Sequence, residues 1–225
     1  MNLLRKIPTR LGIFRSAGTR YHLWYYRMSL WDTTTWVGVK TLKSPADMWN
    51  YQEILYSLKP SLVVEFGTRF GGSALFFAGV MRQIQKRFKV FSVDIDGETI
   101  SERTRLDPDI ELLSCSSLDP KVARRISALR REYPGPVFAI LDSDHSKQHV
   151  LAEMKTLRSV LVSNDYLIVE DSNVNGHPVY PTHGPGPFEA IKEYFREFPD
   201  DYKHDETREE KFGFTFAPQG FLVRR

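Results

Sequence analysis

The fold of this chain is decided by residues 61–73, which read SLVVEFGTRFGGS. The first part, from Ser61 to Phe66, is a short apolar run with the form of a buried strand. A glycine-rich turn follows and leads directly into residues 73–88, which have the pattern of a helix. Glycines in such a turn let the backbone bend sharply and approach a ligand closely. The stretch therefore predicts a strand, a ligand-binding turn and a helix in succession.

Strand and helix patterns alternate along the chain on both sides of this stretch. Upstream, Ser44 followed by Pro45 is typical of a helix start, and apolar residues recur at helical spacing up to Pro60. Downstream, apolar runs predict four further strands with two helices between them: strands at 90–94, 110–113, 137–141 and 166–169, and helices at 119–132 and 147–161. Continuous apolar strands that alternate with helices are typical of a parallel sheet covered on both faces. We therefore expect an α/β fold with a doubly wound, mostly parallel sheet.

The C-terminal part differs from this pattern in two places. Residues 172–187 contain four prolines and three glycines, which exclude a helix or a central strand and predict a long loop. Loops of this length in a compact domain are usually functional. A helix is expected to begin near Pro187, and residues 212–223 predict two short strands joined around Pro218 as an antiparallel hairpin.

The composition is that of a soluble globular protein. The chain has 225 residues, of which 41% are apolar and 26% are charged. Its net charge of +3 arises from 31 Lys and Arg against 28 Asp and Glu. No acidic residue precedes Asp32, whereas six of the basic residues do, so the positive excess belongs to the N-terminal segment. A nucleic-acid-binding body would need Lys and Arg clustered on one face, and we expect no nucleic-acid partner.

Residues 1–43 are basic and aromatic, and we interpret them as an N-terminal arm ahead of a domain that spans residues 44–225. Two interpretations of the arm stay open. Its aromatic residues pack on the domain or on a second subunit of a homo-oligomer, or they make peripheral contact with an anionic membrane surface. No apolar run is long enough to span a bilayer, and the single Cys115 excludes an intramolecular disulfide. We therefore expect a cytoplasmic protein.

Carboxylates follow two of the predicted strands. Asp142 and Asp144 come after the fourth strand. Glu170 and Asp171 come after the fifth. Neighbouring strand ends lie about 5 Å apart, and four carboxylates this close need compensation to stay ionised. A hard divalent cation, Mg²⁺ most simply or Mn²⁺ or Ca²⁺, would supply it; the alternative is that Asp144 and Asp171 cap helices and nearby bases pair with the rest.

The turn after the first strand limits the class of ligand. It lacks the Gly-x-Gly-x-x-Gly of nicotinamide sites, and no Gly-Lys-Ser/Thr follows it. Glu65 beside the ligand would repel a pyrophosphate but suits a cationic aminoacyl sulfonium. Asp94, at the end of the second strand, is placed to meet the hydroxyl pair of a ribose. These residues favour a sulfonium nucleoside over a dinucleotide.

Three segments together resemble the cephalosporin hydroxylase family: residues 64–73, 141–146 and 169–178. Despite its name, that family is similar to S-adenosylmethionine-dependent O-methyltransferases and includes rhamnosyl O-methyltransferases. The likeness runs from about residue 36 to the C-terminus and leaves the basic arm outside. A more distant similarity is to the metal-dependent catechol and caffeoyl-CoA O-methyltransferases. The resemblance implies a Rossmann-like class I methyltransferase fold and Mg²⁺-dependent methyl transfer from S-adenosylmethionine to a hydroxyl of a small acceptor, a sugar or a natural-product scaffold.

The resemblance also implies which residues carry the chemistry. The metal ligands would be Asp142, Glu170 and Asp171, with Asp144 as the alternative to Asp142. Asp171 replaces the amide ligand of the more distant relatives. His145 replaces their lysine base and would accept the proton of the acceptor hydroxyl.

The cofactor pocket and the acceptor contacts are implied in the same way. His177 and His183 lie in the loop 172–187, which would form a lid over the acceptor, and both are candidates for acceptor contact. Nine residues would bind the cofactor: Glu65, Gly67, Arg69, Gly71, Ser73, Asp94, Ser116, Ser117 and Asp142.

Two other function classes stay open as alternatives. The first is a metal-dependent hydroxylase or oxygenase of a secondary metabolite, although a 2-His-1-carboxylate iron site is disfavoured because only one histidine adjoins the carboxylates. The second is a non-catalytic, cofactor-binding assembly subunit. Such a subunit would need neither Glu65 nor the acidic edge.

Overall fold

A computed structural model describes residues 12–225, with side chains from residue 17 onward. This part of the chain contains a seven-stranded sheet in the order β5-β4-β3-β6-β7-β9-β8. Strands β3 to β7 run parallel, and β9 pairs antiparallel with both β7 and β8. The strands are β3 Leu62–Phe66, β4 Lys89–Asp94, β5 Ile110–Ser114, β6 Val137–Leu141, β7 Tyr166–Val169, β8 Tyr202–His204 and β9 Phe221–Arg224.

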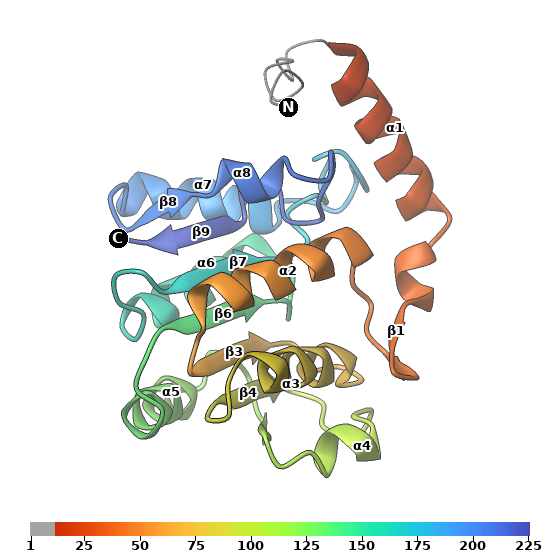
Figure 1. The fold of residues 1–225 in the computed structure, drawn as a ribbon. Helices are drawn as coiled ribbons and strands as arrows, with labels where there is room; N and C mark the ends of the chain where they lie inside the picture. Colours follow the sequence, from red (N-terminus) through yellow and green to blue (C-terminus); the bar gives the residue numbers. More distant parts are fainter. Residues whose placement is uncertain (1–11) are drawn as a thin grey trace, which may run out of the picture.

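Helices cover both faces of this sheet (Figure 1). On one face, α2 and α3 bury side chains such as Tyr51 and Phe77. On the other, α5, α6 and α7 bury side chains such as Ile126, Met154 and Tyr194. The helices are α1 Gly12–Arg27, α2 Pro45–Leu58, α3 Gly72–Ile84, α4 Glu102–Arg105, α5 Pro120–Glu132, α6 Lys147–Arg158, α7 Pro187–Glu197 and α8 Glu206–Glu209. The predicted doubly wound α/β fold is confirmed.

The predicted strands and long helices agree with these bounds to within a few residues. The start of α2 shows why, because Pro45 occupies its first turn and Ser44 caps it as expected. The backbone N–H of Asp47 donates a hydrogen bond of 3.4 Å to Ser44 Oγ. Proline at the first helical position and serine at the cap both favour helix initiation at this point.

The predicted C-terminal hairpin is wrong in one of its strands. Antiparallel strands are present, but β9 pairs with β8, and α8 lies between them. Residues 212–217 do not form a strand. Their apolar alternation serves another purpose, because the rings of Phe214 and Phe216 pack against α1. The backbone N–H of Phe216 donates to Asp47 Oδ2 at 2.8 Å instead of to a neighbouring strand.

The register of the sheet brings the ends of several strands to one edge. Phe66 pairs with Val93 on one side and with Leu141 on the other. Leu141 in turn pairs with Val169. The strand order reverses between β3 and β6, and ligands of open parallel sheets bind at the carboxyl ends of the strands near such a point. The residues that follow these strands therefore face a common site.

The segment before α2 lies against this edge. After α1 come the 3₁₀ helix η2 (Leu30–Thr33) and a short hairpin of β1 (Thr35–Trp36) and β2 (Val39–Lys40). In α1, His22 and Tyr25 are buried against Phe214 and Phe216, whereas Tyr21, Leu23 and Trp24 are exposed. The first eleven residues, with three of the six early basic residues, lie outside the described part. An arm that ends at residue 43, homo-oligomer formation and membrane contact stay predictions.

Within residues 12–225, no helix is both long enough and apolar enough to cross a membrane.

Candidate active site

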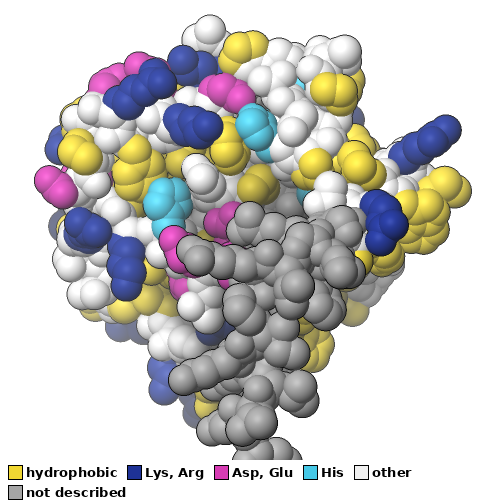
Figure 2. Space-filling view, turned by 90° about the horizontal axis from the view of Figure 1, so that it is seen from above, with side chains coloured by type: hydrophobic (Ala, Val, Ile, Leu, Met, Phe, Trp, Pro, Cys, Tyr) yellow, Lys and Arg dark blue, Asp and Glu magenta, His cyan; other side chains and the backbone are white. Residues whose placement is uncertain are grey.

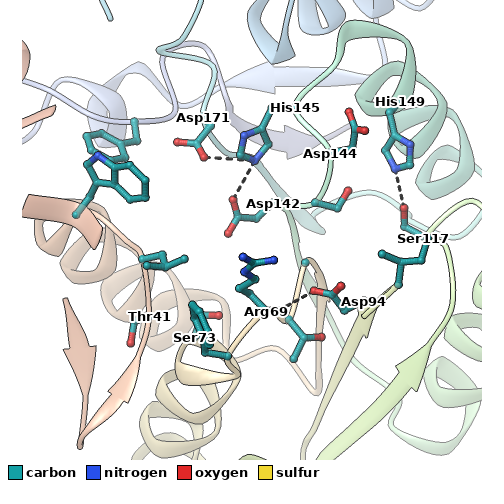
Figure 3. A pocket seen from close by; sticks show the side chains of 18 of the residues that line it. Thr41, Arg69, Ser73, Asp94, Ser117, Asp142, Asp144, His145, His149 and Asp171 are labelled. Carbon is teal, nitrogen blue, oxygen red and sulfur yellow. Dashed lines mark hydrogen bonds and ion pairs between the residues drawn. The ribbon is translucent and has the colours of Figure 1, made fainter. Parts of the chain in front are cut away.

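A cavity of about 660 Å³ opens at the carboxyl edge of the sheet. The turn after β3, the end of β4 and the loops after β5, β6 and β7 form most of its wall. Figure 2 shows histidine and acidic side chains around a hollow in the surface. Figure 3 shows the lining side chains in their positions around the cavity. The cavity lies where the sequence places the ligand.

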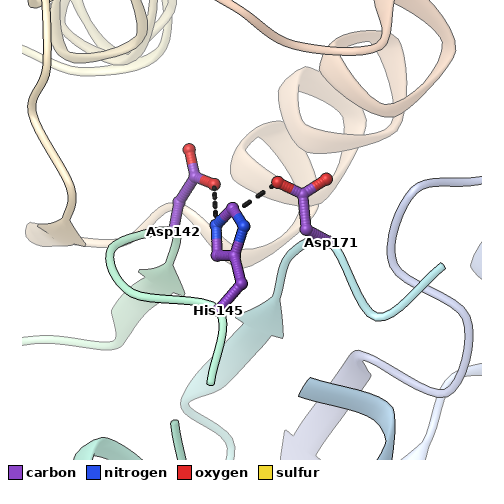
Figure 4. A group of neighbouring side chains, drawn as sticks. All are labelled: Asp142, His145 and Asp171. Carbon is purple, nitrogen blue, oxygen red and sulfur yellow. Dashed lines mark ion pairs between the residues drawn. The ribbon is translucent and has the colours of Figure 1, made fainter. Parts of the chain in front are cut away.

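Asp142, His145 and Asp171 form a cluster in the wall of this cavity (Figure 4). His145 Nε2 lies 3.5 Å from Asp142 Oδ1 and 3.3 Å from Asp171 Oδ2. One ligand atom from each residue lies within 4.8 Å of the others, so the group could hold a metal ion. Two carboxylates with one imidazole do not form a 2-His-1-carboxylate set.

The electrostatics of the cluster follow from its burial and its charges. Burial favours neutral His145, but Asp171 and Asp142 outweigh it and raise the pKa of His145 to about 9. Burial also opposes ionisation of Asp142, yet Lys43 and His145 hold its pKa below the usual range. The pKa of Asp171 is raised by burial. With no further charge present, the cluster therefore holds a protonated imidazole between its carboxylates.

Lys43 lies beside this cluster and is a residue that sequence analysis missed. Its Nζ contacts Asp142 Oδ2 and lies 3.3 Å from Glu170 Oε1, and its side chain is 2% exposed. Burial lowers the pKa of the ammonium, but the surrounding carboxylates of Asp142, Glu170 and Glu65 outweigh this and raise it. Asp142 is thus shared between Lys43 and His145. In the sequence, Lys43 is one base among several in the segment interpreted as an arm, and no local signal marks it.

Glu170 is not part of the cluster, in contrast to the convergence expected from the sequence. Its Oε1 accepts a hydrogen bond of 2.6 Å from the hydroxyl of buried Tyr51 and faces Lys43. Burial raises the pKa of Glu170 to about 8, although Lys43 opposes the shift. Glu170 and Asp171 are consecutive but face different partners. The backbone of Asp171 has a φ of 51°, and its side chain points to His145.

Asp144 also lies outside the cluster, although it lines the cavity. Its Oδ1 accepts a hydrogen bond of 2.7 Å from the backbone N–H of Ser146, directly before α6. Hydrogen bonds from Ser146 lower the pKa of Asp144. This bond closes a turn ahead of α6 and does not cap the helix, whose N-cap is Ser146 without a side-chain cap hydrogen bond. Of the four predicted carboxylates, the structure brings together Asp142 and Asp171.

The turn after β3 is shaped by close backbone packing. A Cβ on Gly67 would lie 1.9 Å from the carbonyl oxygen of Asp142, and its φ is 101°. Gly71 precedes α3 with a φ of 86°, and a Cβ there would meet the side chain of Thr104. Gly71 does not line the cavity, whereas Gly67 and Ser73 do. Both glycines are therefore required by the path of the chain, whatever ligand the turn binds.

Glu65 lies behind this turn and is fully buried. Its Oε2 accepts a hydrogen bond from Ser92 Oγ, whereas its Oε1 has no partner among the described residues. Burial raises its pKa to about 7, with Lys43 and two serine hydroxyls opposing the shift. A buried oxygen without a partner is costly. Glu65 does not line the cavity, so its position does not show the predicted contact with the cofactor.

Asp94 lines the cavity at the end of β4, as predicted. Its Oδ2 accepts a hydrogen bond of 2.7 Å from the backbone N–H of Arg69, and its Oδ1 one of 2.9 Å from Asp96. These bonds fix the carboxylate and leave lone pairs for further donors. Ser116 and Ser117 also line the cavity, so this part of the predicted cofactor set converges.

The two loop histidines have different surroundings. His183 lines the cavity together with Tyr180 of the same loop. His177 does not, because its Nε2 lies 2.8 Å from Glu189 Oε1 and its ring stacks on Phe188 with 3.7 Å between centroids. The expected acceptor contact of His177 is therefore not supported by its position, and its side chain holds the loop to α7.

The remaining wall of the cavity comes from the N-terminal segment, which sequence analysis left without a role in the site. Tyr26, Trp31 and residues 40–42 line it. The rings of Tyr26 and Trp31 stack with 6.0 Å between centroids. The basic and aromatic composition of the segment was the available signal, but it did not indicate which surface these side chains face.

Comparisons with known proteins agree with the fold. A family model described as Rhamnosyl O-methyltransferase/CmcI matches residues 28–225 and so begins within the expected arm. Curated rhamnosyl O-methyltransferases of Mycobacterium bovis (strain BCG / Pasteur 1173P2) and Mycobacterium leprae (strain TN) are 59% and 60% identical to this chain. Each alignment covers 93% of this chain, with 85% and 91% of the respective relative.

Solved structures give the same fold. CmcI with Mg and SAM has a TM-score of 0.69 at 22% identity, over 86% of this chain and 77% of that one. An O-methyltransferase from Bacillus cereus in complex with SAH has a TM-score of 0.54 at 16% identity, over 80% and 82%. The predicted class I methyltransferase architecture is confirmed. The chain is a S-adenosylmethionine-dependent O-methyltransferase, and it belongs to the rhamnosyl O-methyltransferase/CmcI family.

Proposed function

We propose that this enzyme methylates a hydroxyl of a rhamnosyl or similar deoxy-sugar acceptor and that its activity depends on Mg²⁺. The observation that carries the proposal is the cluster of Asp142, His145 and Asp171 in the wall of a cavity that also contains the turn after β3. The cofactor would lie along the strand ends, with its cationic end near Glu65 and Ser73 and its ribose at Asp94.

The donor atoms of the cluster suit a hard cation, because two of the three are carboxylate oxygens. Asp142 and Asp171 would hold it. When bound, Mg²⁺ supplies positive charge that lowers the pKa of the acceptor hydroxyl and of His145. His145 then accepts the hydroxyl proton at Nε2, the atom that faces both carboxylates. Lys43 keeps Asp142 ionised and in place throughout.

The wall opposite the strand ends supports a sugar acceptor. Trp31 and Tyr26 contribute flat apolar area next to polar groups, which suits a ring with both C–H faces and hydroxyls. The indole N–H of Trp31 is buried and has no hydrogen-bond partner among the described residues. It is available to donate to a sugar oxygen. The relatives of about 60% identity are named rhamnosyl O-methyltransferases, which agrees with this acceptor class.

The test is a methylation assay with a synthetic aryl α-L-rhamnoside, S-adenosylmethionine and either Mg²⁺ or EDTA. We expect one added methyl group by mass spectrometry, stoichiometric S-adenosylhomocysteine, and loss of turnover in EDTA that Mg²⁺ restores. Turnover that survives EDTA unchanged would remove the metal from the proposal. Transfer to a flavonoid or catechol at a higher rate than to the rhamnoside would remove the sugar.

A further inference from the structure

A buried carboxylate that the site description leaves without a role lies behind one end of the cavity. Glu153 of α6 is fully buried, and its Oε1 lies 2.5 Å from both Ser117 Oγ and Ser143 Oγ. His149 Nε2 lies 3.2 Å from the same oxygen. Ser117 follows β5, Ser143 follows β6 and His149 belongs to α6. One oxygen atom therefore joins three separate elements.

The three partners of Glu153 line the cavity, whereas Glu153 does not. A carboxylate has no hydrogen to donate, so both serine hydroxyls give it their only hydrogen. Each serine Oγ is then left with lone pairs only, and Ser117 Oγ also lies 3.0 Å from His149 Nε2. The second oxygen of Glu153, Oε2, is buried with no partner among the described residues, a cost that packing alone does not explain. At this end of the cavity, the two serine oxygens can therefore accept hydrogen bonds but donate none.

The position of these oxygens identifies the part of the cofactor that meets them. Figure 3 shows Ser117 and His149 on the far side of the cavity from Asp171, with Asp94 on their side. Methyl transfer takes place near the cluster, and the ribose is assigned to Asp94. The nucleobase is left for the end formed by Ser117, Ser143 and His149. Adenine presents a donor there, its 6-amino group, whereas a 6-oxo purine presents an acceptor.

We propose that Glu153 is a positioning residue that makes the enzyme specific for a 6-amino purine. By taking the hydrogens of Ser117 and Ser143, it leaves oxygens that accept from the amino group and repel a 6-oxo group. The inference rests on the cofactor placement in the proposed function and is independent of the metal and of the acceptor. Glu153 would thus help to select the cofactor, which a carboxylate with a purely structural role would not do.

The test is isothermal titration calorimetry with S-adenosylhomocysteine and its deaminated analogue, S-inosylhomocysteine. The wild-type enzyme should bind the adenosyl compound at least about thirtyfold more tightly. In the analogue, the 6-oxo oxygen would face the serine oxygens, and two buried acceptors cannot form a hydrogen bond. In Glu153→Gln, the amide N–H₂ lies beside the serines and frees their hydrogens to turn toward the cavity. The preference should fall below about fivefold, mainly through tighter binding of the inosyl compound.

Matched variants keep the test decisive. Glu111→Gln changes a carboxylate that pairs with Arg125 away from the cavity and should keep the wild-type preference. If Glu153→Gln does not fold, the Ser117→Ala/Ser143→Ala variant removes the accepting oxygens and should lower the preference instead. Equal binding of both ligands by the wild type, or an unchanged preference in a folded Glu153→Gln protein, overturns the proposal. Failure of both ligands to bind would reject the cofactor placement itself.

Discussion

The two walls of the cavity are built by different means. On the strand-end wall, Asp94 ends β4, Asp142 and Asp171 follow β6 and β7, and the sheet register fixes their spacing. On the opposite wall, Tyr26 and Trp31 belong to a segment outside the sheet. That segment is held by ring packing of α1 and by side-chain contacts such as the one between His22 and Asn173.

This difference separates two tasks. The strand-end wall holds charged groups that must keep their positions during methyl transfer, and a buried parallel sheet gives them a rigid base. The N-terminal wall contributes the aromatic area that we assign to the acceptor, and it lies outside the sheet. We expect mutations in the strand-end wall to affect the chemical step and those in the N-terminal wall to affect acceptor binding.

The largest effect should come from Asp142→Asn. Asp142 contacts both His145 and Lys43, so its loss removes the charge that the rest of the cluster needs. We expect kcat to fall on the order of 10⁴-fold while S-adenosylhomocysteine still binds. Asp144→Asn is the control, because Asp144 lines the same cavity but lies outside the cluster and accepts from the backbone N–H of Ser146, and it should lose less than about tenfold. An equal loss in both variants would contradict the assignment of the cluster.

Lys43→Met should have the next largest effect, mainly on stability. The change leaves the ionised Asp142 without the buried Lys43 ammonium, and breaking such a pair costs about 3–5 kcal/mol. Urea unfolding followed by circular dichroism measures this loss. Adding Asp142→Asn to Lys43→Met should recover part of it, because the ionised carboxylate that Lys43 contacts is removed. No recovery in the double variant would show that Lys43 acts through packing and not through charge.

His22 should make the stability of the N-terminal wall depend on pH. Burial lowers its pKa from 6.5 to about 4, so the folded protein binds fewer protons than the unfolded chain between these values. The free energy of unfolding should therefore fall by up to about 3 kcal/mol as the pH drops from 6.5 to 4. Urea unfolding measured across this range should show that the unfolding free energy changes less steeply with pH in His22→Gln than in the wild type. Identical slopes would mean that the pKa of His22 is the same in the folded and unfolded states.

Sequence patterns predicted the strand-end wall because its physical rules are local. A buried parallel strand is a continuous apolar run, and the polar residues that follow it lie at the ligand-binding edge. Asp94 and Asp142 were found in this way. The pattern did not show which of Glu170 and Asp171 faces the cavity, because that depends on the positive φ at Asp171 and on the distant partners Lys43 and Tyr51.

The N-terminal wall was not predictable because its contacts join distant parts of the chain. Lys43 and Asp142 are 99 residues apart, and His22 and Asn173 are 151 apart. No spacing rule connects such pairs. The same limitation explains the misplaced strand, since Phe214 and Phe216 alternate as in a strand but pack on α1.

The smallest predicted effect is also the most specific for the N-terminal wall. Trp31→Ala removes aromatic area and an indole N–H from the acceptor side of the cavity. The KM for the rhamnoside should rise about tenfold, or about 1.4 kcal/mol, with the KM for S-adenosylmethionine unchanged. Trp31→Phe keeps a ring without the N–H, so its effect separates stacking from hydrogen bonding.

Trp24→Ala is the matched control, because Trp24 lies in the same segment but is 50% exposed and does not line the cavity. It should leave both KM values unchanged. If Trp31→Ala raises the KM for S-adenosylmethionine as much as the KM for the rhamnoside, the two walls do not divide binding of cofactor and acceptor between them. A change confined to the KM for the rhamnoside would show that the N-terminal segment determines which sugar binds. The residues at the strand ends would then carry the chemical step.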